Sequence, residues 1–533
     1  MMKKYLKPNI VIEPLVCSLY LWSYLLPPHT LGLFLKNRYL PGLRSFINFP
    51  ELHTAAATDA TLLGGQFLDV SVDKFTVIHT LITAIETQAA ELLDLAADIE
   101  ALDEKLQLEG TGHSLEHLYE MLPDRLRGCV EFVYDHNNHP KLRFFDKILY
   151  DKFQFSHLQS VLLSPLNTDK RKFVLSTPRI AEPNELQLTI GLKSGLLSDI
   201  CRSRVEGIDY VTLEKQLDLP ENKSKVLASF FNDEPPMLKN CRHYQGEGVR
   251  VRYFGHACIL LQTRDVSILV DPLISYFQPE NGIERYSLDD LPDVIHYVVF
   301  THNHLDHIAF ETLIFLKGRV KQYVFPRSSG GTVLDPCLKL MLIEQGFEGL
   351  IPLDKMEGIS CKDGVIYSFP FLGEHGDLDI QAKSAFYIQL KGYKFLFAAD
   401  SNNLDPGLYE YLHQKVGTLD ALFLGMECVG APVDWIYGPL LSRKLKSKHK
   451  QSRRYSGSDS KRATSLIHAL KSKQVYIYAM GQEAWLSHIM SLDYAMEPPQ
   501  IIESNKFIAD CHDIGQNAVR LFGKFESIYK GEI

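Results

Sequence analysis

The chain has 533 residues, of which 45% are hydrophobic and 23% are charged, as is typical of globular proteins. This length exceeds one ordinary hydrophobic core, so we expect two domains. The formal net charge of −9 and the pI near 6.1 exclude broad nucleic-acid binding, because a surface that binds phosphate backbones needs positive charge.

The cysteines and the amino-terminal stretch bear on the cellular compartment. Nine cysteines are scattered along the chain without a Cys-x-x-Cys pair, which is typical of reduced thiols and gives no zinc-finger or iron–sulfur pattern. The apolar stretch after Met-Met-Lys-Lys is interrupted by Pro8, Glu13, Pro14 and Pro27-Pro28, so no run is long enough to span a membrane. We therefore expect a cytoplasmic enzyme.

The first half of the chain carries helical and strand patterns but no chemical motif. Apolar residues recur at helical spacing from Asp73 to Leu108, which predicts an acidic amphipathic helix in two pieces, and residues 157–163 also favour a helix. Paired prolines in 232–241 predict a linker. We expect a mixed α/β or helix-rich domain over 1–240, serving dimerisation, docking or support, before a second domain over 247–533.

The densest chemical motif is Phe300-Thr-His-Asn-His-Leu-Asp-His-Ile308, which follows the apolar run Tyr297-Val-Val-Phe. The apolar run predicts a buried strand, and the polar residues then lie in the loop at its carboxyl end. Three imidazoles and a carboxylate within six residues are nitrogen and oxygen ligands for metal ions. The motif therefore predicts a two-metal site that uses His302, His304, Asp306 and His307.

The residues before this motif predict a hairpin and two side chains that stand behind the metal ligands. One alternating strand over 249–262, a turn at 263–265 and a buried strand ending at Asp271-Pro272 form a predicted hairpin. Ligating imidazoles need hydrogen-bond acceptors behind them. We therefore expect His256 and Asp271 to stand behind the metal ligands rather than to bind metal directly.

Several residues later in the chain are candidates to complete the metal site. Glu374 and His375 are adjacent, and on an extended segment only one of them would face the metal. Histidine suits a zinc hydrolase, whereas glutamate adds a hard oxygen that suits iron. Asp400, at the end of the apolar strand from Tyr393, is well placed to bridge two cations.

Two further candidates follow later strands. Glu427 comes after the strand 421–426 and is either a supporting carboxylate or a ligand whose binding depends on substrate. His488, in a predicted helix over 483–490, is either a ligand or a packed histidine. Residues 443–454 carry eight basic residues and form either a solvated loop or a docking patch for an acidic partner or a phosphate, since clustered cations attract anions.

The spacing His-x-His-x-Asp-His after a strand resembles the metal motif of the metallo-β-lactamase superfamily. With Glu374, Asp400, Glu427 and a long amino-terminal extension, the chain is similar to one branch, the di-iron β-hydroxylases. These monooxygenases act on amino acids tethered to the carrier domains of nonribosomal peptide synthetases in antibiotic biosynthesis. The resemblance implies an α/β protein whose carboxy-terminal domain is an αββα sandwich.

The resemblance also implies roles for the candidate residues. His302, His304 and Glu374 would hold one iron, Asp306, His307 and His488 the other, and Asp400 would bridge the two, while Glu427 would shift when substrate docks. Two iron ions with an oxo or hydroxo bridge and dioxygen as co-substrate are implied. No nicotinamide or flavin fingerprint is present, so electrons would come from a separate reductase or ferredoxin. We also expect a homodimer.

The competing hypothesis is hydrolytic. In it, two zinc ions occupy the same residues, His375 replaces Glu374 as the ligand, and a metal-bound hydroxide attacks a phosphodiester, lactone or amide. Trp435 and Tyr437 suit an aryl side chain in the site and suit the core equally well.

Overall fold

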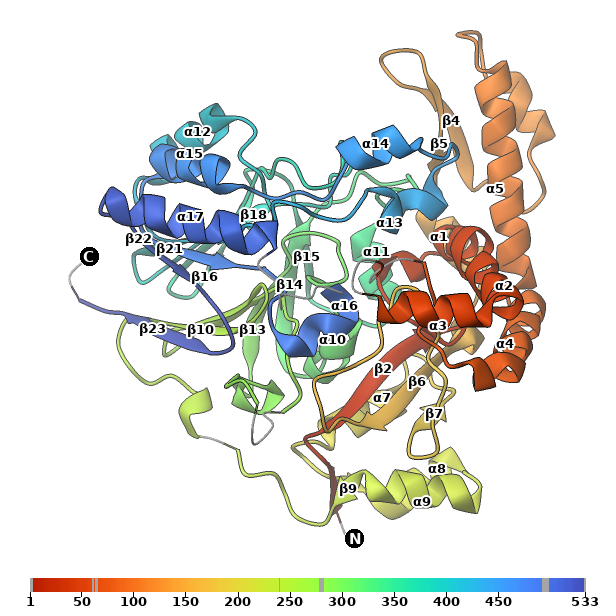
Figure 1. Ribbon diagram of the computed structural model, residues 1–533, viewed down its shortest axis with the longest axis horizontal. Helices are drawn as coiled ribbons and strands as arrows, with labels where there is room; N and C mark the ends of the chain where they lie inside the picture. Colours follow the sequence, from red (N-terminus) through yellow and green to blue (C-terminus); the bar gives the residue numbers. More distant parts are fainter. Residues whose placement is uncertain are drawn as a thin grey trace.

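The computed structural model describes residues 3–59, 62, 66–238, 240–277, 282–490 and 498–531. Figure 1 shows two stacked β-sheets in the second half of the chain, lying beside the helices and the small sheet of the first half. None of the described helices is both long and apolar enough to cross a membrane.

Two seven-stranded sheets form the centre of the second half. The strands of the first sheet are, in spatial order, β15 (Leu350–Leu353), β14 (Val320–Pro326), β13 (Ile295–Val299), β12 (Ser267–Val270), β11 (Cys258–Gln262), β10 (Val249–Gly255) and β23 (Phe525–Tyr529). The strands of the second sheet are β16 (Gly358–Cys361), β17 (Gly364–Phe369), β18 (Ala385–Leu390), β19 (Tyr393–Phe397), β20 (Leu419–Gly425), β21 (Ser472–Tyr478) and β22 (Asn517–Arg520).

Alternation of side chains along the strands explains the layered packing. Alternate residues such as Val251, Ile268 and Phe397 face the space between the two sheets and form one apolar core. The opposite face of the second sheet packs against helices that lie together over it in Figure 1: α12 (Pro406–Val416), α15 (Ser460–Leu470) and α17 (Pro499–Asp513). The outer face of the first sheet is covered by α10 (Phe310–Leu316) and α11 (Leu338–Glu344), and by the first half of the chain. The predicted αββα sandwich is confirmed.

The strands predicted around the metal motif are found, with one correction. Strands β13, β19 and β20 match the apolar runs from which they were predicted. The single strand expected over 249–262 is instead two strands, because the chain reverses at His256-Ala257, where His256 has a φ of 50°. The predicted hairpin turn at Thr263–Asp265 then joins β11 to β12.

The first half of the chain is mixed α/β, as expected. Its helices are α1 (Pro28–Phe34), α2 (Leu40–Asn48), α3 (Pro50–Thr58), α4 (Phe75–Gln88), α5 (Ala90–Glu109), α6 (Asp146–Lys152), α7 (Gly195–Arg202), α8 (Tyr210–Leu217) and α9 (Glu221–Ser229). Its strands are β1 (Lys3–Leu6), β2 (Ile10–Val16), β3 (Leu19–Tyr20), β4 (Val130–Tyr134), β5 (Pro140–Phe144), β6 (Gln159–Pro165), β7 (Leu186–Leu188), β8 (Ile208–Asp209) and β9 (Phe231–Asn232).

Two sequence predictions for this half have different outcomes. The acidic helix is indeed in two pieces, α4 and α5, which meet at Ala89 with a φ of −105° and a ψ of 19°. The helix predicted over 157–163 is wrong, because most of that run lies in β6, which pairs along its whole length with β2. Buried neighbours on both faces of a strand produce the same continuous apolar run as a buried helix.

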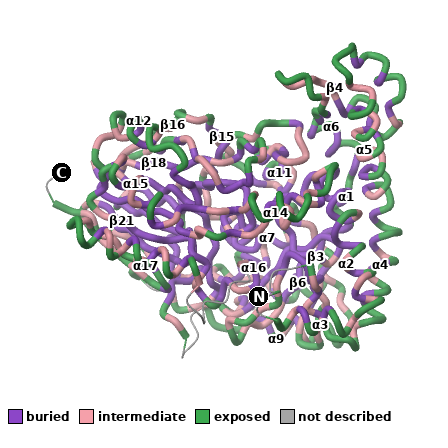
Figure 2. The backbone as a smooth tube through the Cα atoms, turned by 45° about the horizontal axis from the view of Figure 1, so that its top comes forward, coloured by how far each residue is buried: buried purple, intermediate pink, exposed green. Residues whose placement is uncertain are grey.

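The two halves share one apolar core. A single cluster joins Trp22 and Leu95 of the first half to Phe300 and Leu313 of the second, and α10 contacts both α7 and β2. Figure 2 shows buried backbone continuing from the sheets into the first half, with exposed backbone along α4 and α5. We propose that the domain boundary lies within residues 233–248. The described residues of this range contain no strand and only one short helical turn, at 240–242.

Candidate metal centre

The histidine motif lies where the sequence placed it, at the carboxyl end of β13. Strands β12, β13 and β14 are parallel neighbours, so the loops after them meet at one edge of the sheet. The rings of His302 and His307 lie 4.0 Å apart, and those of His302 and His304 lie 4.7 Å apart. All three histidines are buried. The motif is therefore folded into a compact cluster of imidazoles.

Carboxylates from other strands join these imidazoles. Ligand atoms within 4.8 Å of one another form three groups: His302 with His304 and Glu374, His302 with His307 and Asp400, and His256 with Asp306 and His307. Asp400 Oδ2 lies 3.3 Å from His307 Nε2 and 3.7 Å from His302 Nε2. Asp400 thus stands between the two ends of the cluster, which is the position that a bridging carboxylate needs.

Asp271 supports the cluster from behind, as predicted. Its Oδ2 lies 2.8 Å from His307 Nδ1, and its Oδ1 accepts the backbone N–H of Thr301 at 2.7 Å. With Nδ1 engaged, His307 presents Nε2 to the cluster. Asp271 has a φ of 42°, so β12 ends in a sharp turn that carries the side chain under the histidine loop.

Glu374 and His375 both point inward, which the sequence argument did not anticipate. That argument assumed an extended segment, but Glu374 has a φ of 64° between Gly373 and Gly376, which also have positive φ. Glu374 Oε1 lies 3.0 Å from His304 Nδ1, and His375 Nδ1 lies 2.5 Å from Glu374 Oε2. Glutamate rarely adopts a left-handed backbone, which makes this turn a strained one. The turn places the Glu374 carboxylate in the cluster with the His375 imidazole behind it.

The unpaired atoms of the cluster fit metal ions. Buried atoms without a hydrogen-bond partner include His302 Nε2, His307 Nε2 and Asp400 Oδ1. Buried polar atoms are normally paired, and among the described residues no Lys or Arg side chain forms an ion pair with Asp306, Glu374 or Asp400. Imidazole and carboxylate donors together suit iron and zinc alike. The residues therefore fit a pair of cations.

Electrostatics point the same way. Burial and the neighbouring His307 hold the pKa of His302 well below its usual value, while burial and the nearby Asp400 raise the pKa of Glu427 well above its usual value. Burial opposes protonation of His307, but Asp306, Asp400 and Asp271 together raise its pKa well above 6.5. Crowded carboxylates that attract protons so strongly will also attract metal cations.

His488 does not lie with the cluster. Its Nε2 is 2.8 Å from a guanidinium nitrogen of Arg171, and its backbone oxygen accepts the N–H of Val174 at 2.8 Å. None of the three candidate groups among the described residues contains it. His256, which the sequence placed behind the ligands, has its Nε2 2.9 Å from Asp306 Oδ2 and forms one candidate group with Asp306 and His307. The turn at His256-Ala257, which interrupts the strand predicted over 249–262, is the feature that brings His256 next to Asp306.

A cavity of about 450 Å³ opens onto the cluster. Glu427 lines it, together with Asp306, Glu374 and Asp400. Apolar walls come from both halves of the chain: Leu62, Phe67, Leu175, Trp435, Ile436, Ile489 and Met490. Of the two aromatic candidates, Trp435 lines the cavity, whereas the buried Tyr437 places its hydroxyl 3.1 Å from His304 Nε2.

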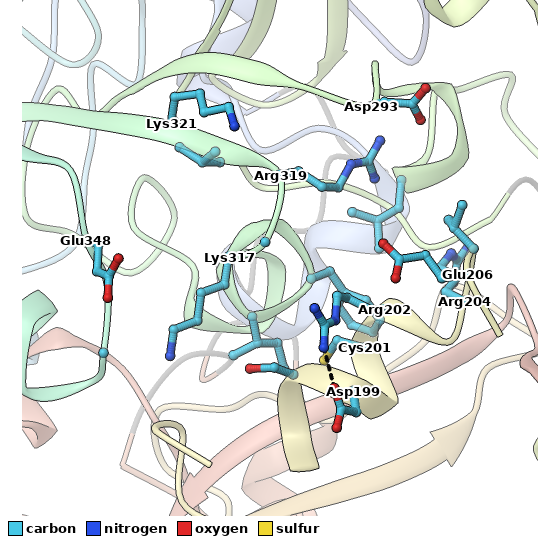
Figure 3. Close-up of a pocket in the computed structure, with 18 of the residues that line it drawn as sticks. Asp199, Cys201, Arg202, Arg204, Glu206, Asp293, Lys317, Arg319, Lys321 and Glu348 are labelled. Atoms are coloured by element: carbon cyan, nitrogen blue, oxygen red, sulfur yellow. Dashed lines mark hydrogen bonds and ion pairs between the residues drawn. The ribbon is translucent and has the colours of Figure 1, made fainter. Parts of the chain in front are cut away.

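A larger cleft of about 810 Å³ lies between the two halves at the opposite end of the first sheet (Figure 3). Its basic residues are mostly engaged: Arg202 pairs with Asp199, and Arg204 with Asp289. Lys317 and Arg319 donate to backbone carbonyls. The cleft contains none of the candidate metal groups found among the described residues. The smaller cavity is therefore the one that opens onto the candidate metal groups.

Stacked sheets that carry buried His, Asp and Glu side chains at their loop edge define a metallo-β-lactamase-fold enzyme with a dinuclear metal site. Residues 267–436 match the family described as the β-lactamase superfamily domain. Residues 5–235 match the family described as the di-iron non-haem β-hydroxylase N-terminal domain.

Whole-chain relatives identify the branch. The chain is 33% identical over 525 residues to the 4-amino-L-phenylalanyl-[CmlP-peptidyl-carrier-protein] 3-hydroxylase of Streptomyces venezuelae, with 98% of each chain covered. The crystal structure of CmlA, a di-iron β-hydroxylase from that species, matches with a TM-score of 0.93 and 33% identity, covering 99% of this chain and 100% of the other. A UPF0173 protein of Pyrococcus abyssi is 33% identical over 121 residues, which are 23% of this chain and 48% of its own. The chain therefore belongs to the di-iron non-haem β-hydroxylase family.

Proposed function

We propose that this β-hydroxylase acts on an aminoacyl group that is held as a thioester on the carrier domain of a nonribosomal peptide synthetase. The proposal rests on the full-length relative, whose substrate is an aminoacyl group on a peptidyl carrier protein. It favours hydroxylation over the hydrolytic alternative, because the relatives that this chain matches over its whole length are hydroxylases.

The observation that carries the proposal in the site itself is the position of Glu374. Its carboxylate lies in one group with His302 and His304, and His375 lies behind it. We propose that His302, His304 and Glu374 hold one iron, that Asp306 and His307 hold the second, and that Asp400 bridges them. A carboxylate in this place adds negative charge and a hard oxygen donor, which stabilise the higher oxidation states of iron.

The two iron ions, when bound, supply the reduction of dioxygen that hydroxylation requires. Inserting one oxygen atom into a C–H bond and reducing the other to water consumes two electrons and two protons. We propose that a separate reductase or ferredoxin provides the electrons. The chain itself holds the substrate: the apolar wall formed by Leu175, Trp435 and Ile489 excludes water from the cavity, and it suits a large uncharged side chain.

Glu427 is the carboxylate of the cavity that lies outside the three candidate metal groups among the described residues. We propose that it moves when the aminoacyl group enters, because it is partly buried and lines the space that the substrate would fill. This residue would then couple substrate entry to the arrangement of the cluster.

We also propose that the chain forms a homodimer. Large apolar side chains on or next to α3 and α4 are exposed, among them Phe49, Leu52, Phe75 and Val77. Exposed large apolar side chains are a common feature of protein–protein interfaces. Sedimentation analysis of the parent chain and of a Leu52→Glu, Val77→Glu variant tests this; a parent that sediments as a monomer would contradict it.

The experiment that tests the proposed activity uses intact-protein mass spectrometry. Carrier domains loaded with different aminoacyl groups are incubated with the reduced, iron-loaded chain and oxygen. We expect the carrier-bound group to gain one oxygen atom while its thioester stays intact. Release of the aminoacyl group without oxygen incorporation would instead support hydrolysis. Iron content and the near-ultraviolet absorption of an oxo-bridged ferric pair provide an independent measure of the metal, since zinc is colourless.

A further inference from the structure

Residues 443–454, named the basic segment here, lead from the surface into the wall of the metal cavity. The segment contains helix α14 (Ser447–Ser452). Its first cations are exposed, and among the described residues none of these side chains has a hydrogen-bond or ion-pair partner: Arg443, Lys444, Lys446 and Lys448. In a chain with a net charge of −9, this is a local concentration of unpaired positive charge.

The end of the segment is anchored rather than loose. Lys450 pairs with Asp434 of α13 (Asp434–Tyr437) at 2.5 Å, and Arg453 Nε donates to the backbone oxygen of Gly376 at 2.7 Å. The backbone N–H of Val433 donates to the backbone oxygen of Arg453 at 2.9 Å. The segment is therefore tied both to the Glu374 turn and to the helix that carries Trp435, which argues against a freely solvated loop. Figure 1 shows α14 beside α13.

Arg454 stands at the inner end of the segment and lines the metal cavity. Its Nε donates to the backbone oxygen of Gly430 at 2.7 Å, which holds the side chain against the cavity wall. Among the described residues, its two terminal nitrogens have no partner, and no carboxylate lies within ion-pair distance of them. A guanidinium held by Nε with both terminal nitrogens free can bind a phosphate through two parallel hydrogen bonds.

We propose that Arg454 binds the phosphodiester of the carrier's phosphopantetheine arm, and that Arg443, Lys444, Lys446 and Lys448 contact an acidic face of the carrier domain. This inference rests on the proposed function, because the arm is present only in a carrier-bound substrate. The arm would then enter beside Gly430, with its thioester directed toward the cluster. Cations outside the cavity attract the acidic domain, and the single guanidinium at its rim sets the depth of the arm.

The test compares three substrates that carry the same aminoacyl group: the pantetheine thioester, the 4′-phosphopantetheine thioester, and the loaded carrier domain. We expect Arg454→Gln to lower the preference in kcat/KM for the phosphorylated over the unphosphorylated arm by about tenfold, through KM rather than kcat. Arg454→Lys should restore part of this preference, since it restores the charge but not the paired hydrogen bonds. An unchanged preference in Arg454→Gln would overturn the phosphate site.

The surface cations are tested separately. In a variant with Arg443, Lys444, Lys446 and Lys448 all changed to Ser, we expect KM for the loaded carrier to rise about tenfold and to lose most of its salt dependence, with both small thioesters unaffected. The matched control changes four exposed lysines elsewhere to Ser: Lys215, Lys223, Lys339 and Lys506. An equal effect of the two fourfold variants would overturn the docking surface.

Binding measured without turnover separates this inference from the proposed activity. Fluorescence anisotropy of a labelled carrier domain gives the dissociation constant for the iron-loaded chain, with and without the phosphopantetheine arm. We expect the arm to strengthen binding to the parent chain and to add little in Arg454→Gln. If the arm strengthens binding to the parent chain but not to Arg454→Gln, the docking site is supported even if hydroxylation fails on every substrate. If the arm adds nothing to binding of the parent chain, the docking site is overturned.

Discussion

Two buried charged clusters meet at the loop and helix that follow β13, and they satisfy their charges in different ways. In one, Arg171 binds both oxygens of Glu311, at 2.9 and 2.6 Å, and also binds Glu13, which Arg179 approaches at 2.8 Å. In the other, Asp306, Glu374 and Asp400 have imidazoles nearby but no Lys or Arg ion pair among the described residues. The first cluster is neutralised by its own side chains, and the second needs cations from outside.

This difference explains the place of His488. Its Nε2 accepts a hydrogen bond from Arg171, so it belongs to the cluster that balances itself. That cluster joins β2, α10 and α16 (Ser487–Met490), and Ile489 and Met490 of α16 line the metal cavity. The neutralised cluster therefore holds the cavity wall in place, while the other one contains the side chains that we propose as metal ligands.

Removing Arg171 should have the largest effect on stability. Arg171→Gln leaves Glu13 and Glu311 buried with fewer counter-charges, which should lower the free energy of unfolding by about 3–5 kcal/mol. Urea unfolding of the purified chain measures this loss. Arg125→Gln, which breaks exposed pairs with Asp94 and Asp98, is the matched control and should lower the free energy of unfolding far less, because solvent screens exposed pairs. Similar losses in the two variants would show that the buried pairs contribute no more than exposed ones.

Changing Glu374 should have the largest effect on activity. Glu374→Ala removes the carboxylate that we propose as a ligand of the first iron, and we expect hydroxylation to fall by more than about a hundredfold, since even the partners behind metal ligands are worth ten- to a hundredfold. Glu374→His restores a ligand without the negative charge and should bind metal without restoring hydroxylation. Iron analysis and single-turnover assays measure the two effects. Full hydroxylation by Glu374→His would contradict the proposed role of the carboxylate.

Asp271 should have a smaller effect, acting through His307. Asp271→Asn keeps the shape of the side chain but removes the charge that lies 2.8 Å from His307 Nδ1. We expect iron affinity to fall about tenfold, measured by competition with a chelator. Asp420→Asn, at a buried carboxylate that pairs with Lys473 on the outer side of the second sheet, is the control and should leave iron affinity unchanged.

His488 should affect the pH dependence of stability and leave the metal in place. Burial and Arg171 hold its pKa well below 6.5 in the folded chain, so the unfolded chain binds an extra proton as the pH falls below 6.5. Between pH 6.5 and 5.5 this residue alone therefore lowers the free energy of unfolding by about 1 kcal/mol, since the slope reaches its limit of about 1.4 kcal/mol per pH unit only at lower pH. In His488→Gln, unfolding measured at pH 6.5 and 5.5 should show a correspondingly smaller loss.

The exposed His79→Gln controls for the loss of one imidazole from the chain. Iron content should stay at two ions per chain in both histidine variants. A His488→Gln chain that binds only one iron would instead return His488 to the ligand set.

The sequence predicted the strands that carry the site because each is a run of apolar residues ending in a polar group. It predicted His302, His304, Asp306 and His307 as a cluster because they are close along the chain. Asp400 followed from the same pattern on β19. The helix expected over 157–163 was wrong because strands buried on both faces have no distinguishing period.

The local sequence pattern determined the individual strands, the metal motif and the two pieces of the acidic helix, since each of these depends on residues that are close along the chain. Only the tertiary structure decided how Glu374 and His375 both face inward, because a positive φ at a glutamate is imposed by the surrounding turn. It also decided that His256 joins Asp306 while His488 joins Arg171, since the partners are 50 and 317 residues apart. Spacing along the chain carries no information about contacts at such separations.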